Sequence, residues 1–428
     1  MRTCRVLYEI GIRRLLQFGV TISSESQLLA FSHYISHSPS TRAPLLRRLR
    51  ISIQADPYTP SVHEIAGDGE IGHYMDSDGD SNGEEYSLHG DNNNDEDTLE
   101  NGGDLKEDKG GGDAVNRERS SAGVLALAQI LRLAGNLEDL RLGYLEELLQ
   151  SFPIKALSNA AFKDEHLLLG AVATLTSIKH LHLASFGTLA LALFKSVTSP
   201  LVEVDIKFRL WKRRMINPNI LHLLSKYCAT LEKITVWHVD IHEDFVQLSN
   251  NTPRFPRVHT LCIRQPENLS LSVLLHAFPN LQSLDVTGLF DAAGVVDDTH
   301  DENRELDDSQ SLVGLRYLSG DIITLYALGL TRDVERLDIS EVDLSLSDEM
   351  MLETILDGAR PTTLLLRIGY PLTKWHGPMV LVEELVFVPT LYTRVTHLAL
   401  DNLDIYMPLL RPPANDPNVG ATAPIVSH

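Results

Sequence analysis

The sequence has few cysteines, comparatively little positive charge and no long apolar run, and each shortage excludes a class of protein. Only Cys4, Cys228 and Cys262 occur in 428 residues, without a CxxC pair or a Cys/His zinc spacing. We therefore expect neither a disulfide framework nor a structural zinc site, and we predict a reducing compartment, cytoplasmic or nuclear. No apolar run approaches the roughly 18 residues of a membrane span, so no membrane association is predicted.

Basic residues are outnumbered, with 37 Lys and Arg against 58 Asp and Glu and a formal net charge of −21. Binding to nucleic acid requires an excess of cations on the contact face, so a nucleic-acid-binding protein is not expected. The acidity is concentrated locally. Residues 67–109 contain 15 acidic and 2 basic residues, which accounts for 13 of the 21 net negative charges.

Composition divides the chain into four segments. Residues 1–54 are apolar and basic, 55–121 are rich in Gly, Asp, Asn and Ser, 122–405 are periodically aliphatic, and 406–428 form a flexible tail. Residues 55–121 lack the apolar side chains that would offset the entropy of ordering them, which predicts a disordered acidic insertion. A second, shorter acidic interruption spans residues 291–308.

One stretch of the insertion resembles a calcium-binding loop. DGDSNGEEYSLH, residues 78–89, has Asp78, Asp80, Asn82 and Gly83 at the first, third, fifth and sixth positions of an EF-hand loop. The twelfth position holds His89, where a bidentate Glu is needed, and no amphipathic helices flank the stretch. A solvated acidic linker is the preferred interpretation, and no metal or other cofactor is predicted.

Beyond the insertion, the pattern aliphatic-x-x-aliphatic-x-aliphatic recurs. Complete copies start at residues 137, 178, 201, 231, 258, 281, 334 and 395, and degenerate copies contain Leu315/Leu318 and Leu366/Ile368. The nine steps from 137 to 395 average about 29 residues, within the range of solenoid repeats.

Each complete copy follows a segment with a different spacing. Residues 127–142, 221–236 and 271–286 align without a gap, and each begins with aliphatic residues three and four apart, as on one face of a helix. A turn and a short strand follow. The repeat therefore predicts an α/β solenoid, an irregular horseshoe of short parallel strands and helices whose apolar faces are buried between neighbouring repeats.

This pattern resembles the long, helix-containing leucine-rich-repeat proteins over about two-thirds of the chain. The Asn or Cys that this family carries just beyond each strand is replaced here by apolar residues: Leu145, Phe186, Val239, Leu289, Val342 and Leu403. The resemblance thus implies the fold, while the replacements predict a coil that is held by packing and has no asparagine ladder.

The N-terminal segment, predicted to be helical, resembles a more particular family. MRTCRVLY, residues 1–8, and the run that follows it are similar to the end of the F-box in fungal F-box proteins with leucine-rich repeats, and Leu46, Leu49 and Ile51 would supply the first strand. In that family a Leu-Pro-led helix pair docks on the Skp-type adaptor of a cullin–RING ubiquitin ligase. This chain starts after the pair, so the resemblance carries over only the end of the docking surface: Met1, Cys4, Leu7 and Tyr8.

Two interpretations of this start remain open. Either coding sequence is missing upstream, or the protein does not bind the adaptor in the usual way. The arginines at positions 2, 5, 13 and 14 also permit a mitochondrial presequence, but Glu9 argues against it.

Residues between the inward-facing aliphatics of each strand should face outward on the concave side of the sheet. This predicts a surface that recognises a protein partner, formed by Arg141, His182, Asp205, Trp237, Arg264, Asp285, Arg336 and Asp338, with Thr235, Cys262 and Ala399 in the same series. The alternative is that these are merely solvated positions of a sheet.

Two further clusters have ordinary explanations. His180 and His182 are not expected to bind metal, since neither has a carboxylate or third ligand at a suitable offset in the sequence. KFRLWKRR, residues 207–214, is consistent with a nuclear-localisation signal, a dock for the acidic insertion, or an ordinary basic loop.

No P-loop, GxGxxG, HExxH, GxSxG or kinase signature is present. The leading hypothesis is a non-enzymatic, monomeric F-box-like subunit that selects a target protein for ubiquitination. The alternatives are a repeat scaffold without a ligase role and a hydrolase hidden in an irregular α/β fold.

Overall fold

The structure is a computed structural model that describes residues 2–53, 112–144, 159–208, 219–241, 252–289, 295–307, 314–342, 346–368 and 395–401. Met1, the EF-hand-like stretch and residues 209–214 of the basic cluster lie outside this part of the chain. No helix in the described ranges is both long enough and apolar enough to cross a bilayer.

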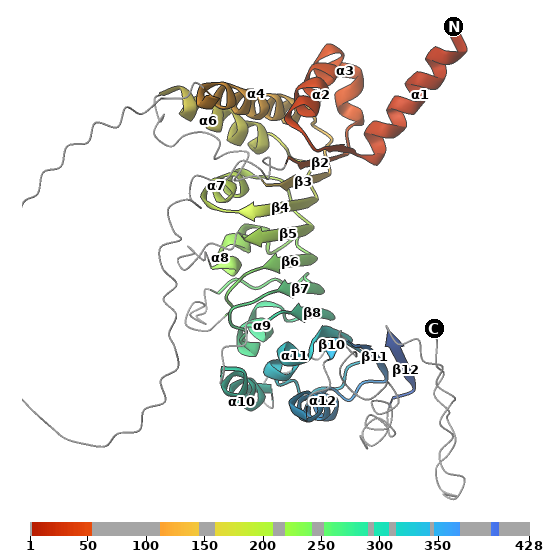
Figure 1. Ribbon diagram of the computed structural model, residues 1–428, viewed down its shortest axis with the longest axis vertical. Coiled ribbons are helices and arrows are strands. Elements are labelled where there is room, and N and C mark those ends of the chain that lie inside the picture. Colours follow the sequence, from red (N-terminus) through yellow and green to blue (C-terminus); the bar gives the residue numbers. More distant parts are fainter. Residues whose placement is uncertain are drawn as a thin grey trace, which may run out of the picture.

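The described strands form one open parallel sheet, in which every strand pairs with its neighbours in sequence (Figure 1). The strands are β1 (Val20–Ile22), β2 (Arg48–Ser52), β3 (Asp139–Gly143), β4 (His180–Phe186), β5 (Glu203–Phe208), β6 (Lys233–Trp237), β7 (Thr260–Arg264), β8 (Ser283–Thr287), β9 (Tyr317–Asp321), β10 (Arg336–Val342), β11 (Thr363–Ile368) and β12 (His397–Asp401). Sequential parallel pairing requires a crossover between successive strands.

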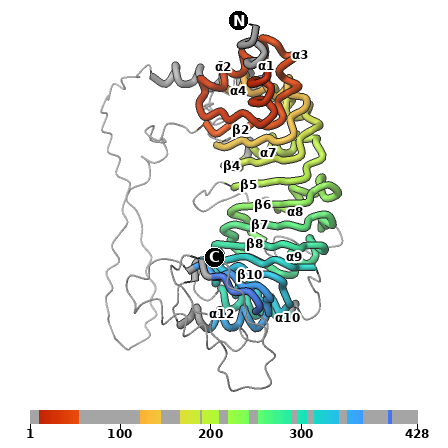
Figure 2. Tube along the Cα trace, turned by 90° about the vertical axis from the view of Figure 1, so that its right-hand side faces the viewer, coloured from red at the N-terminus to blue at the C-terminus, as the bar shows by residue number. Residues whose placement is uncertain are grey.

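Helices supply most of those crossovers and lie on the outer side of the arc, whereas the strands line its inner side (Figures 1 and 2). They are α1 (Arg2–Phe18), α2 (Glu25–His37), α3 (Pro39–Arg42), α4 (Gly112–Leu133), α6 (Asn159–Ala173), α7 (Thr188–Ser196), α8 (Ile220–Leu224), α9 (Leu271–Ala277), α10 (Val295–Asp307), α11 (Ile322–Leu328) and α12 (Leu346–Ala359). Helix α1 differs from the rest, because it projects from the N-terminal end of the arc. The predicted α/β solenoid-like architecture is therefore present.

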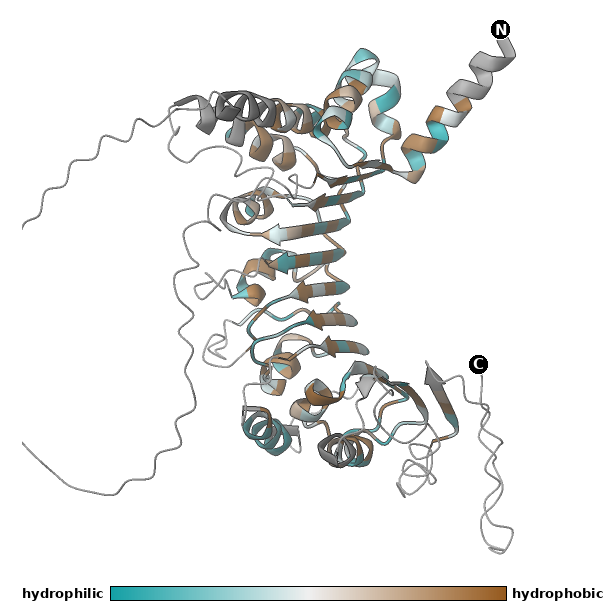
Figure 3. Ribbon diagram, viewed as in Figure 1, coloured by the Kyte–Doolittle hydropathy of each residue, from teal (hydrophilic) through white to brown (hydrophobic). Residues whose placement is uncertain are grey.

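The aliphatic repeat forms the core. Leu140, Leu181, Val204, Ile234, Leu261, Leu284, Leu318, Leu337, Leu364 and Leu398 are register partners from β3 to β12, and so form one continuous row. All but Leu398 are at most 2% exposed. Figure 3 shows the resulting alternation of hydrophobic and hydrophilic bands along the strands. Each buried Leu contributes about 1.5–3 kcal/mol, and neither a strand nor a helix could bury its apolar face without the other.

The replacements for the family's Asn pack as expected where they are described. Phe186, Val239 and Leu289 are buried. The Phe186 ring lies edge-on to Phe208, with 5.0 Å between ring centres, and it also contacts the ring of Phe194. At these turns aromatic and aliphatic packing therefore supplies cohesion.

Several boundaries differ from the sequence-based predictions. The sheet begins one strand earlier than expected, at β1, because Gly19 adopts φ +122° after α1 and turns the chain into a strand. In the eleventh strand Leu364 pairs in register with Leu337 and Leu366 with Ile339, so the repeat's buried pair is Leu364 and Leu366, two residues earlier than the predicted Leu366/Ile368. Two aliphatic residues at alternate positions do not by themselves fix the phase of a strand.

Two segments assigned to acidic or polar interruptions contain helices. Helix α4 starts at Gly112, inside the range predicted as insertion. Helix α10 occupies most of the second acidic interruption and has a buried side: Asn303 accepts a hydrogen bond from the Leu271 amide (2.8 Å) and donates to the carbonyl of Ala327 (2.9 Å). Its acidic residues lie mainly on the exposed side, so composition alone concealed an amphipathic helix.

Candidate interaction surface

The inner face of the sheet carries a row of side chains between the two buried aliphatic rows. We call this the central row. In register from β2 to β12 it contains Arg50, Arg141, His182, Asp205, Thr235, Cys262, Asp285, Ser319, Asp338, Leu365 and Ala399. Successive strands of a sheet are about 4.8 Å apart. The predicted outward-facing residues therefore do lie side by side along one surface.

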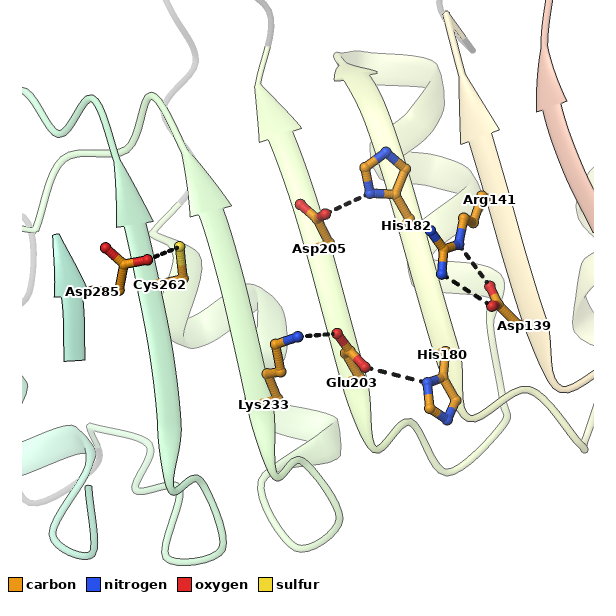
Figure 4. A network of polar contacts seen from close by, with 9 residues as sticks. All are labelled: Asp139, Arg141, His180, His182, Glu203, Asp205, Lys233, Cys262 and Asp285. Carbon is orange, nitrogen blue, oxygen red and sulfur yellow. Dashed lines mark hydrogen bonds and ion pairs between the residues drawn. The ribbon is translucent and has the colours of Figure 1, made fainter. Parts of the chain in front are cut away.

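Ion pairs link the central row to the next row toward the strand starts (Figure 4). On β3 the Arg141 guanidinium donates to both carboxylate oxygens of Asp139, at 3.1 and 3.2 Å. This hydrogen bonding raises the pKa of Arg141, against the opposing effect of burial. Arg141 therefore remains charged, and half of its side chain (51%) is exposed.

The two histidines of β4 each face a carboxylate on β5. His182 Nδ1 lies 2.6 Å from Asp205 Oδ2, and His180 Nδ1 lies 3.3 Å from Glu203 Oε2. Lys233 on β6 also donates to Glu203, at 2.6 Å. The sequence offered no carboxylate at a suitable offset, because these partners come from a strand more than 20 residues away. Even so, no cluster of three or more potential metal ligands occurs within the described ranges.

A second polar cluster lies on β7 and β8. Arg264 pairs with Asp285 and donates to Thr287 Oγ1 at 2.6 Å, and Cys262 Sγ lies 3.6 Å from Asp285 Oδ2. Burial raises the pKa of Asp285, although Arg264 lowers it. Burial and the adjacent Asp285 raise the pKa of the Cys262 thiol to about 11.

Asp338 departs from the prediction that the whole row is exposed, since it is only 2% exposed. Arg336 holds it in a two-pronged pair, with Nε to Oδ1 at 2.8 Å and Nη2 to Oδ2 at 2.9 Å, and Tyr317 OH donates to Oδ2 at 2.9 Å. Asp338 therefore positions Arg336, which is half exposed and available for contact. The sequence could not show this, because the covering Tyr317 belongs to a degenerate repeat.

Trp237 is half-buried at the C-terminal end of β6. Lys207 of β5, its register partner, places Nζ 4.9 Å from the centre of the indole ring. This is a cation–π distance, and it orients an aromatic side chain next to the central row. Aromatic and arginine side chains are the types that contribute most to protein interfaces.

The predicted adaptor-contact residues are placed only in part. Positions 4, 7 and 8 belong to α1, whose C-terminal half exposes three large apolar side chains: Ile10 at 49%, Leu15 at 68% and Phe18 at 76%. The opposite side of this half is anchored by buried Leu16, whose carbonyl accepts a hydrogen bond from the Arg47 amide. Helix α1 thus presents an apolar surface, which commonly marks a contact site.

A pocket of ≈ 330 Å³ lies among α10, α11 and α12. Its lining mixes apolar side chains such as Leu325 and Ile355 with charges of both signs, and Arg360 at its edge is paired with Asp333 at 2.8 Å. The lining is neither predominantly apolar nor of one charge, so it does not indicate a particular ligand. The inner face of the sheet is therefore the stronger candidate for a binding site.

Comparison with known proteins adds no assignment: neither a scan against protein-family models nor a search of the curated proteins finds a match to this chain.

Proposed function

We propose that this protein is a non-enzymatic interaction module of the leucine-rich-repeat type, which binds a target protein on the inner face of its sheet. The observation that carries the proposal is the continuous central row, whose charged groups, with Trp237 beside them, lie on the side of the sheet opposite to the helices that the structure describes. Such extended inner surfaces are the usual binding sites of solenoid proteins.

The proposal includes a role as the substrate-recognition subunit of an SCF-type ubiquitin ligase. Two features support it: the similarity of residues 1–8 to the end of an F-box, and the exposed apolar side chains of α1. In this arrangement α1 contributes to docking on the Skp-type adaptor, and the inner face holds the target.

Association with the adaptor is tested by co-purification with a recombinant Skp-type adaptor, using a chain that includes any upstream coding sequence. The double variant Leu15→Ser/Phe18→Ser should lose association, whereas Met350→Ser, which changes a residue 72% exposed on α12, should not. Absence of association for the unmodified chain would refute the ligase role. It would leave the second candidate, a repeat scaffold that binds its partner without delivering it to a ligase.

Target binding is tested separately by site-specific cross-linking. A photoreactive residue at Thr235, in the middle of the central row, should cross-link the target, while one at Leu125, 40% exposed on α4, should not. If the photoreactive residues at Thr235 and Leu125 capture the same proteins, the inner face is not the binding surface and the proposal fails.

The hydrolase alternative has weaker support. Cys262, a candidate nucleophile on the inner face, has a thiol pKa raised to about 11, whereas a catalytic thiol needs a lowered one. The His182–Asp205 pair could orient a base, but His182 lies three strands away from Cys262, which is about 14 Å at the usual strand spacing. These groups do not form a nucleophile–base pair.

A further inference from the structure

The first part of this acidic chain is basic. Residues 1–53 contain eight arginines, no lysine and two glutamates, in a protein of net charge −21. Two of the arginines are engaged within the fold: Arg42 donates to the Tyr34 carbonyl at 2.7 Å, and Arg47 pairs with Glu138. The question is which of the others carry charge that no described residue neutralises.

Arg48 and Arg50 do so on the inner face of the sheet. Both are exposed, on either side of the buried Leu49 of β2, and neither has a hydrogen-bond or ion-pair partner among the described residues. Arg50 is the register partner of Arg141 on β3, so two guanidinium groups occupy adjacent positions of the central row.

Gly19 lies beside the start of the Arg48 side chain. A Cβ at position 19 would be 3.0 Å from Arg48 Cβ, so a larger residue there would crowd the arginine. The glycine thus leaves room for Arg48, whose side chain is exposed.

Farther along the row, each carboxylate has a partner. Asp205 lies against His182, Asp285 pairs with Arg264, and Asp338 is held by Arg336. Arg141 is also paired, with Asp139 of its own strand. Among the described residues of β2 and β3, the arginines without a partner are Arg48 and Arg50, and we call these two the arginine edge.

We propose that the arginine edge binds an acidic segment of the partner protein, whose carboxylates pair with these guanidinium groups. This inference rests on the proposed function and specifies the chemistry of the partner at one end of the inner face. Arginine suits the role, because its planar fork of donors matches a carboxylate.

Two other anionic partners fit the geometry less well. Nucleic-acid affinity grows with the number of phosphates that Lys and Arg neutralise, and the arginine edge supplies only two guanidinium groups. A membrane surface is flat, whereas β2, the strand that carries these arginines, lies on the inner side of the arc (Figure 1). An extended polypeptide can follow that surface.

The test uses the full chain and a fluorescein-labelled peptide of twelve glutamates, followed by fluorescence anisotropy at low and at moderate salt. Loss of two exposed charge contacts in Arg48→Gln/Arg50→Gln should weaken binding about three- to tenfold and should reduce its salt dependence. The matched control, Arg132→Gln/Arg304→Gln, makes the same charge change at exposed positions of α4 and α10 and should bind as the unmodified chain does. Arg48→Lys/Arg50→Lys should retain part of the affinity.

Equal affinity for Arg48→Gln/Arg50→Gln and the control would overturn the proposal. So would tighter binding of the unmodified chain to phosphatidylserine vesicles or to a twelve-nucleotide RNA, if the same variant abolishes it. The Thr235 cross-link distinguishes failure of the proposed function from failure of the arginine-edge proposal. If the target is still captured from Thr235 while the arginine edge proves irrelevant to the peptide, the proposed function stands and this inference alone fails.

Discussion

Gly320 offers a sharp test of the structure, because the repeat pattern and the packing predict opposite effects of filling its position. It lies on β9 in register with Val286 and Ile339, where the other repeats carry a buried aliphatic side chain. The pattern alone predicts that a side chain added at this position would fill the core. Each buried CH2 group would then raise the free energy of unfolding by about 0.8 kcal/mol.

The packing predicts the reverse. A Cβ on Gly320 would lie 2.3 Å from the Val286 carbonyl oxygen and 2.9 Å from Leu325 Cγ. Helix α11 begins directly after β9, capped by Asp321, and places Leu325 where other repeats have their strand aliphatic. Since β8, which carries this carbonyl, is paired on both sides, the carbonyl cannot retreat easily. We expect Gly320→Ala to lower the free energy of unfolding by about 2–3 kcal/mol, near the upper end for overpacking.

Urea denaturation followed by circular dichroism measures the effect. The control is Gly170→Ala in α6, where a Cβ meets nothing within 4 Å; it should raise stability by roughly 0.5–1 kcal/mol. Adding Leu325→Ala should not rescue Gly320→Ala, because the carbonyl contact remains. If Gly320→Ala is as stable as the unmodified protein, the account of β9 and α11 is wrong.

Three further predictions concern buried polar groups. Asp338→Asn should destabilise the fold by about 2–4 kcal/mol in the same assay, because it leaves the Arg336 fork incompletely paired; a loss below 0.5 kcal/mol would contradict the assigned burial. The Cys262 thiol, with its pKa raised to about 11 by burial and Asp285, should react with iodoacetamide roughly fiftyfold more slowly at pH 9 than a thiol of ordinary pKa. Since that pKa is raised by folding, its contribution to stability should be full below about pH 9 and lost as the pH rises toward 11, which denaturation at several pH values checks against Cys262→Ser. Asn303→Ala removes partners of the Leu271 amide and the Ala327 carbonyl and should cost about 2–3 kcal/mol, with faster amide hydrogen exchange at Leu271 as the specific sign.

The strand pattern predicted many residues of the candidate surface, because the alternation of inward-facing and outward-facing side chains along a strand is a local property. Arg141, His182, Asp205 and Asp285 lie in the central row as predicted. Arg48 and Arg50 were missed, although they flank Leu49 just as the predicted residues flank their own aliphatics. Reading the first repeat with the same rule as the later ones would have found them.

The sequence by itself determined which residues form the core and that the chain folds as a stack of strands and helices, since spacing decides which face of each element is apolar. Only the tertiary structure decided which charges on the inner face remain free. Partners more than 20 residues away engage Asp205 and Asp285, whereas Arg48 and Arg50 have none among the described residues. Pairing of charges depends on distances across strands, and these exist only once the strands are in register.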